Sequence, residues 1–264
     1  MTDAVPQTVV AALDDPFAQL GGPLAGTRKL HFEVTSTTTL TPHMQRLGLT
    51  AAELDGFSYQ PGQDVMVLVA ADGRKPVRRR YTIRHLDRAA RMITVDVVLH
   101  GAGPGERWVR SVRPGDRIEG IGPRGKIFPD PAADWHLFMG DESAMPAIQA
   151  MVEALPGDAD ATLVLEIPEV ADEQEVLAAA RTRVSWLHRL GRPAGDPAAL
   201  SAEAAEVELP PGNGHAYLLG EARVVLAMRE VLASRGLTEE QMSPKAYWGR
   251  GRANAGHGEP ARDS

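Results

Sequence analysis

The hydrophobic pattern of the first half of the chain predicts short strands. Apolar and polar residues alternate in the first two runs, and the next two are rich in β-branched and apolar residues. The runs are residues 30–34, 44–49, 65–69 and 93–99. Gly and Pro turn signals, such as residues 121–123, separate them. Strands at this spacing without intervening helices predict a small antiparallel Greek-key β-barrel over residues 28–130, after an N-terminal extension of residues 1–27.

The pattern changes after Pro129, where compact apolar strands begin to alternate with helical segments. Predicted strands lie at 135–139, 162–167, 184–188 and 216–219, and predicted helices at 144–155 and 221–234. Such alternation is typical of a mostly parallel, layered α/β sheet, which we expect over residues 131–251. Residues 191–214, rich in Ala, Pro and acids, are interpreted as a surface excursion, and residues 252–264 as a flexible tail.

Composition narrows the class of protein. The chain has 264 residues, 43% hydrophobic and 24% charged, which is ordinary for a globular protein. It has no cysteine, which excludes disulfides, thiolate metal sites and cysteine nucleophiles. No signal-peptide pattern opens the sequence, and no apolar run approaches the roughly 20 residues of a membrane helix. We therefore expect a cytoplasmic protein without membrane insertion, and a monomer.

Charge is unevenly distributed. The net charge of −7 argues against general nucleic-acid binding. Residues 74–91, however, hold eight Lys or Arg against one acid, Asp87. This basic segment indicates a small anionic ligand, and a solvated loop face is the alternative interpretation.

The stretch Arg79–Arg84 reads Arg-Arg-Tyr-Thr-Ile-Arg inside a β-prone run. In a strand, Arg79 and Tyr81 share one face, with Thr82 on the other. A guanidinium can pair with phosphate, a phenol can lie against a flat ring, and a hydroxyl can bond the ring edge. The stretch is consistent with a flavin dinucleotide site, although an ordinary strand gives the same pattern.

Two turns add candidate chemistry. The Gly-rich segment His100–Trp108 follows a strand and precedes a predicted short helix over 106–111, an arrangement that suits a pyrophosphate. His100 itself is interpreted as structural. The turn Gly140–Ile148 lies at the carboxyl end of a predicted parallel strand, where α/β sheets bind ligands, although a capped helix start explains it equally well.

Other motifs are absent or ambiguous. The sequence lacks Gly-x-Gly-x-x-Gly, a Walker loop, His-Glu-x-x-His and Gly-x-Ser-x-Gly. Its eight histidines show no metal-ligand spacing, so we expect no protein-bound metal. Near the C-terminus, Lys245–Arg252 combines two aromatics with Gly and Arg, which fits either a ligand site or an edge strand with a frayed end.

These motifs together resemble the siderophore-interacting proteins, the ferric-siderophore reductases of the ferredoxin-reductase superfamily. The resemblance runs over residues 29–251. It implies an FAD-binding barrel followed by an NAD(P)H-binding-like domain. The positions that it assigns to flavin and nicotinamide are Arg79, Tyr81, Thr82, Arg84, His100, Gly101, Pro104, Gly105, Trp108, Asp141, Glu142, Ser143, Ala144, Tyr247 and Trp248.

The chain departs from the family pattern at two places. Glu106 and Arg107 stand where the family often has a small residue and Ser, which brings a carboxylate beside the expected pyrophosphate. Gly249 stands where Arg is common, so the basic lining near a siderophore is expected to differ.

The implied activity is reduction of a ferric siderophore by FAD, with NADH or NADPH as donor. From local charge, we expect an anionic ferric siderophore to be steered by Arg74, Lys75, Lys126, Arg250 and Arg252. Two alternatives stay open: a flavin-dependent reductase serving a ferredoxin or free flavin, and a siderophore-binding protein without a redox role.

Overall fold

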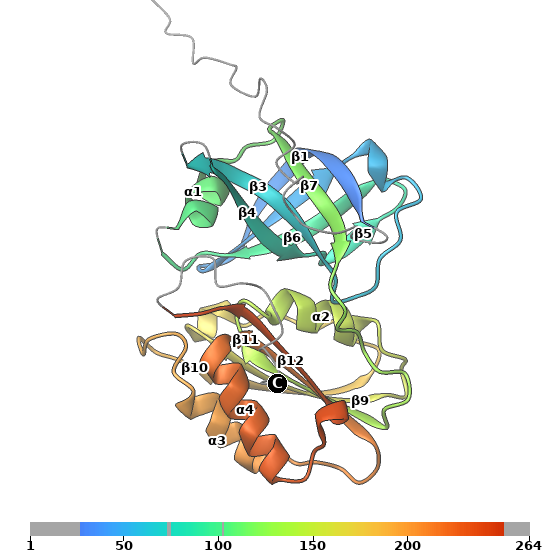
Figure 1. Cartoon of the computed structure of the whole chain (residues 1–264), viewed down its shortest axis with the longest axis vertical. Coiled ribbons are helices and arrows are strands. Elements are labelled where there is room, and N and C mark those ends of the chain that lie inside the picture. The colour runs from blue at the N-terminus through green and yellow to red at the C-terminus, as the bar shows by residue number, and fades with distance from the viewer. Residues whose placement is uncertain (1–26, 73–74, 102, 251–264) are drawn as a thin grey trace, which may run out of the picture.

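The computed structural model describes residues 27–72, 75–101 and 103–250, which form two β-sheets and their helices (Figure 1). Except for Thr27, the predicted N-terminal extension lies outside the described residues, as does the predicted tail from residue 252.

The first sheet has seven antiparallel strands in the order β4-β3-β7-β1-β2-β6-β5. It curls into a half-barrel, which confirms the predicted antiparallel architecture in an open form (Figure 1). Its strands are β1 (Arg28–Thr41), β2 (Met44–Thr50), β3 (Asp64–Asp72), β4 (Lys75–Thr82), β5 (His85–Asp87), β6 (Met92–Val98) and β7 (Arg117–Arg124). The short helices are η1 (Ala52–Leu54) and α1 (Pro104–Ser111).

The prediction of a turn at residues 121–123 is wrong, because these residues belong to β7, between β3 and β1. Glycine serves close packing here. A Cβ on Gly120 would lie 2.9 Å from the Phe32 ring, and one on Gly122 would lie 2.7 Å from Val65 Cγ1. Small residues in a strand therefore let the curled sheet approach its own core.

The second sheet has five parallel strands in the order β10-β9-β8-β11-β12. Its strands are β8 (Trp135–Asp141), β9 (Asp160–Ile167), β10 (Arg181–His188), β11 (Gly214–Glu221) and β12 (Met242–Trp248). Its helices are α2 (Met145–Glu153), η2 (Val170–Asp172), α3 (Ala198–Glu206), α4 (Ala222–Ser234) and η3 (Glu239–Gln241). Every residue of β8 is buried, as expected for a central parallel strand covered on both faces.

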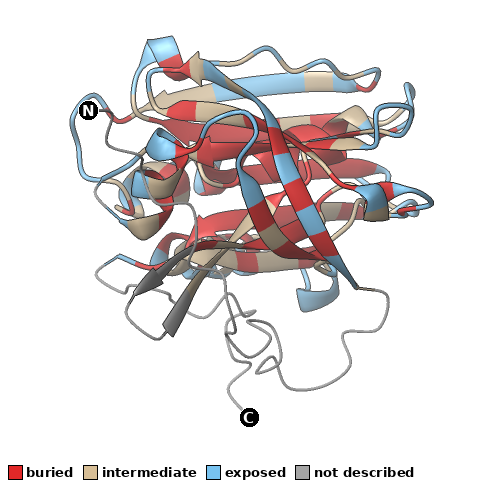
Figure 2. Ribbon diagram, turned by 90° about the horizontal axis from the view of Figure 1, so that it is seen from above, coloured by how far each residue is buried: buried red, intermediate tan, exposed pale blue. Residues whose placement is uncertain are grey.

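The two faces of this sheet have separate cores. On the half-barrel side, α2 packs with Phe138 and Tyr217, and Met44 of the half-barrel joins them. On the other side, α3 and α4 pack against residues such as Leu218. Figure 2 shows the buried residues running as layers through both sheets.

The interpretation of residues 191–214 as a surface excursion is wrong in part. The segment contains α3, whose Leu200 and Ala204 are fully buried and whose contacts run to α4. With only these two residues buried, the helix shows a weak apolar stripe among alanines and acids, so its pattern did not stand out in the sequence.

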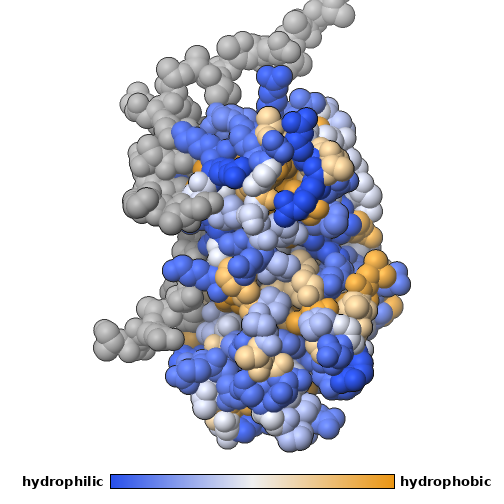
Figure 3. Space-filling model, turned by 90° about the vertical axis from the view of Figure 1, so that its right-hand side faces the viewer, coloured by the Kyte–Doolittle hydropathy of each residue, from blue (hydrophilic) through white to orange (hydrophobic). Residues whose placement is uncertain are grey.

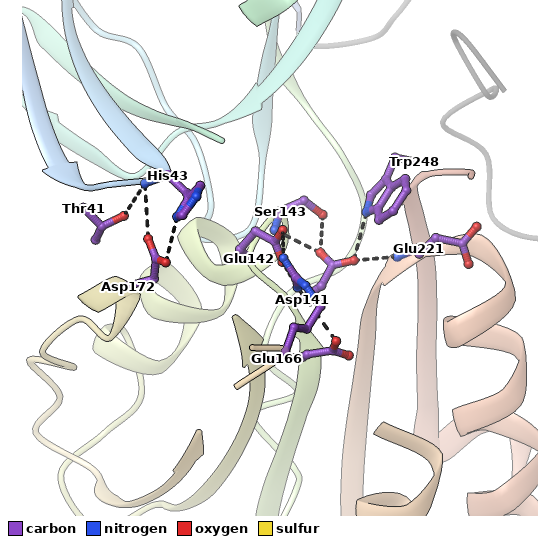
Figure 4. Close-up of polar contacts among 10 residues, drawn as sticks. Thr41, His43, Asp141, Glu142, Ser143, Glu166, Asp172, Glu221 and Trp248 are labelled. Carbon is purple, nitrogen blue, oxygen red and sulfur yellow. Dashed lines mark hydrogen bonds and ion pairs between the residues drawn. The ribbon is translucent and has the colours of Figure 1, made fainter. Parts of the chain in front are cut away.

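Polar contacts join the half-barrel to the parallel sheet. The Asp172 carboxylate, 3% exposed, accepts the His43 backbone N–H at 3.2 Å and lies 2.9 Å from His43 Nδ1 (Figure 4). The Arg84 guanidinium donates to both oxygens of Glu153 on α2 at 2.6 and 2.5 Å. These contacts fix the two sheets against each other and shape the space between them.

One face of the molecule is mostly hydrophilic, with small scattered apolar patches (Figure 3). Among the described residues, no helix is long and apolar enough to span a membrane.

Candidate functional site

A cavity lies between the half-barrel and the parallel sheet. The space in it that no atom fills, counted together with open solvent at its mouth, is about 1140 Å³. It is bounded by β4 and β6, by the start of α1, and by the carboxyl ends of β8 and β12. The lining residues are Asp64, Arg79, Arg80, Tyr81, Thr82, Asp96, Val97, Val98, His100, Gly103, Gly105, Glu106, Ser143, Pro146, Lys245, Tyr247 and Trp248.

Strand β4 presents Arg79 and Tyr81 to helix α1, as the alternation predicts. Tyr81 stacks on Trp108 of α1, with ring centroids 5.9 Å apart and planes 15° apart. A Cβ on Gly105 would lie 3.1 Å from Tyr81 Oη and 3.3 Å from Arg79 Cγ. Burial raises the pKa of the Tyr81 phenol, so the ring stays neutral. This face of β4 therefore combines one guanidinium with a neutral aromatic surface.

The opposite face of β4 carries Arg80 and Thr82 toward the parallel sheet. Arg80 donates two hydrogen bonds to the Asp64 carboxylate, one of them 2.8 Å from Nε to Oδ1. Thr82 lies close enough to the Tyr247 side chain to oppose the rise that burial causes in the pKa of the Tyr247 phenol. From β12, Lys245 Nζ lies 3.6 Å from Asp64 Oδ2 and 4.9 Å from the centre of the Tyr247 ring. The half-barrel and β12 thus build this wall of the cavity together.

The Gly-rich segment forms the third wall. Its helix α1 begins at Pro104, two residues earlier than expected, because proline suits the first helical position. Glu106, 7% exposed, accepts the Gly101 backbone N–H and two bonds from Arg110, at 2.9 and 2.7 Å. The negative charge of Glu106 is therefore compensated by Arg110 within the segment. This pairing reduces the repulsion expected between a carboxylate at this position and a bound pyrophosphate.

At the carboxyl end of the sheet, Asp141 is the centre of a hydrogen-bond cluster (Figure 4). Its Oδ1 accepts the Ser143 N–H at 2.9 Å and the Ser143 hydroxyl at 2.5 Å. Its Oδ2 accepts the Glu221 N–H and the Trp248 indole N–H, both at 2.9 Å. Burial, and then the neighbouring Glu142 charge, raise the pKa of Asp141 to about 6. Asp141 therefore ties together the ends of β8, β11 and β12.

Two further acids lie beside it. Glu142 forms a buried two-bond ion pair with Arg189, both distances 2.6 Å. Glu166 lies 3.9 Å from the same guanidinium, and burial raises the pKa of its carboxyl to about 7. Asp141 and Glu142, two residues predicted from the sequence, therefore lie outside the cavity lining and bond residues around it.

The cavity gathers only part of the residues that the sequence assigned to flavin and nicotinamide. Those that line it are Arg79, Tyr81, Thr82, His100, Gly105, Ser143, Tyr247 and Trp248. Those that do not are Arg84, Gly101, Pro104, Trp108, Asp141, Glu142 and Ala144. Trp108 and Asp141 contact lining residues directly, whereas Arg84 is held in its ion pair with Glu153. The His100 ring stacks on Trp248, with centroids 6.4 Å apart.

The residues expected to steer a siderophore are less well placed. Arg74 and Arg252 lie outside the described residues, and the side chain of Lys75 is not described. Lys126 and Arg250 are exposed, and neither lines the cavity. Sequence reasoning missed the cluster of Asp64, Arg80 and Lys245; only the Lys245 position beside two aromatics offered a signal.

The lining fits FAD. Arg79 and the start of α1 offer a cation and backbone N–H groups to phosphates. Neutral rings from Tyr81 and Tyr247, and the indole of Trp248, offer flat surfaces to an isoalloxazine ring. Open space at Gly103, where an added Cβ would meet nothing within 4 Å, lets a ligand approach the backbone. Among the described residues, no group of three His, Asp or Glu is arranged to hold a metal ion.

Known proteins share this architecture. Residues 133–251 match the model of the siderophore-interacting protein family, and residues 68–127 match its siderophore-interacting FAD-binding domain. An uncharacterized protein of Mycobacterium tuberculosis is 37% identical, covering 85% of this chain and 92% of that protein. Ferric vibriobactin reductase ViuB of Vibrio cholerae is 32% identical, over 67% of this chain and 66% of ViuB.

A solved structure extends the match to three dimensions. The siderophore utilization protein from T. fusca superposes with a TM-score of 0.79 at 31% identity, covering 88% of this chain and 97% of that protein. These matches support FAD and NAD(P)H as the cofactors of the fold. The chain belongs to the siderophore-interacting protein family, within the ferredoxin-reductase fold.

Proposed function

We propose that this chain is an NAD(P)H-dependent, FAD-containing ferric-siderophore reductase. The observation that carries the proposal is the cavity between the two sheets, whose lining brings together Arg79 and the start of α1, three aromatic rings, and the cations Arg80 and Lys245. The family match and the ferric reductase among the relatives support a flavin-dependent reductase of ferric siderophores.

Bound in this cavity, FAD would supply the chemistry of accepting a hydride from NAD(P)H and passing electrons one at a time to ferric iron. One NAD(P)H and two Fe(III) give NAD(P)⁺, a proton and two Fe(II). Hard oxygen ligands bind Fe(II) more weakly than Fe(III), so reduction releases the metal from its siderophore. Iron is therefore substrate here, and the protein requires no metal ligands of its own.

The residues of the chain have holding and orienting roles. Arg79 and the first N–H groups of α1 hold the phosphates, and Glu106 fixes the Gly101 backbone beside them. Thr82 and Tyr247 lie together in the lining and support one edge of the ring site. Asp141 positions Trp248 and Ser143 at the carboxyl end of the sheet, where the donor nicotinamide is expected.

Charge supports an anionic acceptor. Arg80 and Lys245 line the cavity, and both pair with Asp64, which brings two cations to the wall beside the rings. We also propose that the basic residues named from the sequence steer the complex toward the mouth; they are Arg74, Lys75, Lys126, Arg250 and Arg252. We place the reaction in the cytoplasm and expect a monomer that binds no nucleic acid, in keeping with the net charge of −7.

A visible spectrum and an anaerobic titration test the proposal. The purified protein should be yellow, and NADH or NADPH should bleach it. Ferric aerobactin, an anionic siderophore complex, added anaerobically to the reduced protein, should restore the oxidised spectrum and give Fe(II) that ferrozine traps. Reoxidation by ferredoxin or free flavin, but not by a ferric chelate, would indicate the general reductase. A colourless protein that binds the chelate would indicate a binding protein without a redox role.

A further inference from the structure

Lys245 is a lysine in an unusual position. Lys245 is only 8% exposed. It lies between β12 and the half-barrel and lines the cavity. Lysine is almost never this buried unless it is paired, because burial removes water from the ammonium group. Packing alone does not explain why a lysine occupies a position where its ammonium group loses hydration.

The ion pair with Asp64 is an incomplete explanation. Both oxygens of Asp64 already accept hydrogen bonds from Arg80, and Lys245 Nζ is 3.6 Å away, beyond ordinary hydrogen-bond length. The half-buried Arg124 also interacts electrostatically with Asp64 and Arg80. Among the described residues, the Asp64 carboxylate therefore interacts with Arg80, Arg124 and Lys245, and it only partly compensates the charge of Lys245.

The Lys245 ammonium lies beside the aromatic rings of the cavity. Lys245 and Tyr247 alternate on β12, so their side chains share one face, and the ammonium lies 4.9 Å from the centre of the Tyr247 ring. Tyr247 in turn lies beside Thr82 of β4 in the lining of the cavity. Burial lowers the pKa of Lys245, but Asp64 opposes this effect and favours the charged ammonium.

We propose that Lys245 sets the reduction potential of the bound FAD, by favouring the negative charge that the ring system gains on reduction. This inference rests on the proposed function and names a tuning residue within it. A fixed cation favours the electron-rich state of a neighbouring ring over its neutral oxidised state, and low water access strengthens the effect. Lys245 acts through its charge and does not transfer a proton or an electron.

Lys245→Met removes the charge and leaves the Arg80–Asp64 pair intact. We expect reduced FAD to bind roughly tenfold more weakly than in the unchanged protein, with less than about a threefold change for oxidised FAD. A tenfold change corresponds to a fall of about 30 mV in the two-electron midpoint potential. The midpoint is measured by anaerobic dye-coupled reduction of the FAD-loaded protein, without iron, and the dissociation constant of oxidised FAD by fluorescence titration.

Two variants make the test specific. Lys245→Arg keeps the charge and should keep the potential, and Lys29→Met removes an exposed lysine of β1 and should change neither quantity. Asp64→Asn removes the shared carboxylate and should shift the potential upward, the opposite sign from Lys245→Met. If Lys245→Met is unstable, the midpoint potential is measured in Lys245→Gln, where it should fall, and in Asp64→Asn, where it should rise.

The results separate this inference from the proposed function. An unchanged midpoint in Lys245→Met, or a rise in KM for the anionic ferric aerobactin with an unchanged midpoint, would overturn the inference and leave the reductase activity standing. A wild-type protein that binds no FAD would overturn the proposed function and this inference with it. A lower midpoint in Lys245→Met, retained in Lys245→Arg, supports it.

Discussion

Replacement of Arg84 by Leu distinguishes two roles for the last arginine of the β4 motif. The family resemblance assigns Arg84 to FAD, whereas in the structure its guanidinium holds the half-barrel against α2. The side chains of Arg84 and Glu153 are 11% and 24% exposed, and Arg84 Nε donates to Gln149 at 3.2 Å. Asp96 lies 4.0 Å from the same guanidinium.

The cost of Arg84→Leu follows from this geometry. Removing one partner of a buried ion pair costs about 3–5 kcal/mol, because the remaining charge loses its compensation. Glu153 is partly reached by solvent, so we expect about 3 kcal/mol, at the lower end of that range. Asp96 contributes little to this loss, because Arg46 still donates two hydrogen bonds to it at 2.7 and 2.8 Å.

A double-mutant cycle with Glu153→Gln measures the pair itself. Glu153→Gln alone should cost about 1–2 kcal/mol, since Arg84 keeps Gln149 and Asp96 nearby. The double variant should lose less than the sum of the single losses, with a coupling energy of about 1.5 kcal/mol. Urea unfolding, followed by tryptophan fluorescence with and without saturating FAD, gives all four free energies.

The two roles differ in the FAD arm of that experiment. If Arg84 serves only in the ion pair, Arg84→Leu should change the FAD dissociation constant of the folded protein by less than about threefold. A lost contact to FAD worth about 1.4 kcal/mol would instead change it about tenfold. Additive losses, with zero coupling to Glu153, would refute the ion-pair account. So would a small loss of stability together with a large loss of FAD affinity.

Three further predictions concern the cavity and the sheet edge. Arg79→Met should raise the FAD dissociation constant about 10- to 100-fold, the value of a charged hydrogen bond, and a fluorescence titration showing unchanged affinity would contradict the phosphate assignment. Because the folded-state pKa values of Asp141 and Glu166 are raised to about 6 and about 7, the folded protein holds more protons than the unfolded chain near pH 5 to 7. Stability should therefore fall as pH rises from 5 to 8, by up to about 3 kcal/mol, and a rising urea midpoint would contradict this sign. Gly140→Ala should lower the thermal midpoint, since its Cβ would meet the Leu219 carbonyl and lie 2.9 Å from Ala144 Cβ, at a cost of about 1–3 kcal/mol. Gly157→Ala, with its nearest neighbour at 3.6 Å, should change the midpoint little, and equal losses in both would contradict the steric argument.

Local patterns in the sequence predicted much of the fold. The β-branched runs and the apolar segment of β8 gave the two-sheet architecture, because alternation and continuous burial leave direct marks on the sequence. Helix α3 was missed because its buried side consists of Leu200 and Ala204 among other alanines. The glycines of β7 were mistaken for a turn, since packing against Phe32 and Val65 involves strands far away in the chain.

The site was predictable where one strand contained the information. Alternation on β4 correctly separated Arg79 and Tyr81 from Thr82. The basic segment 74–91 did not form one charged surface, because Arg80, Arg84 and Arg88 each bond a different part of the protein. The Lys245–Asp64 contact joins residues from both sheets, and no local pattern encodes such a meeting.

A single turnover of the anaerobic, FAD-loaded protein tests whether the protein reduces siderophore-bound iron. One equivalent of NADH or NADPH reduces the protein, excess donor is removed, and the anionic complex ferric aerobactin is added in the presence of ferrozine. We expect two ferrous–ferrozine complexes for each FAD reoxidised, with full return of the flavin absorbance. A flavin that stays reduced beside the intact ferric chelate would contradict it.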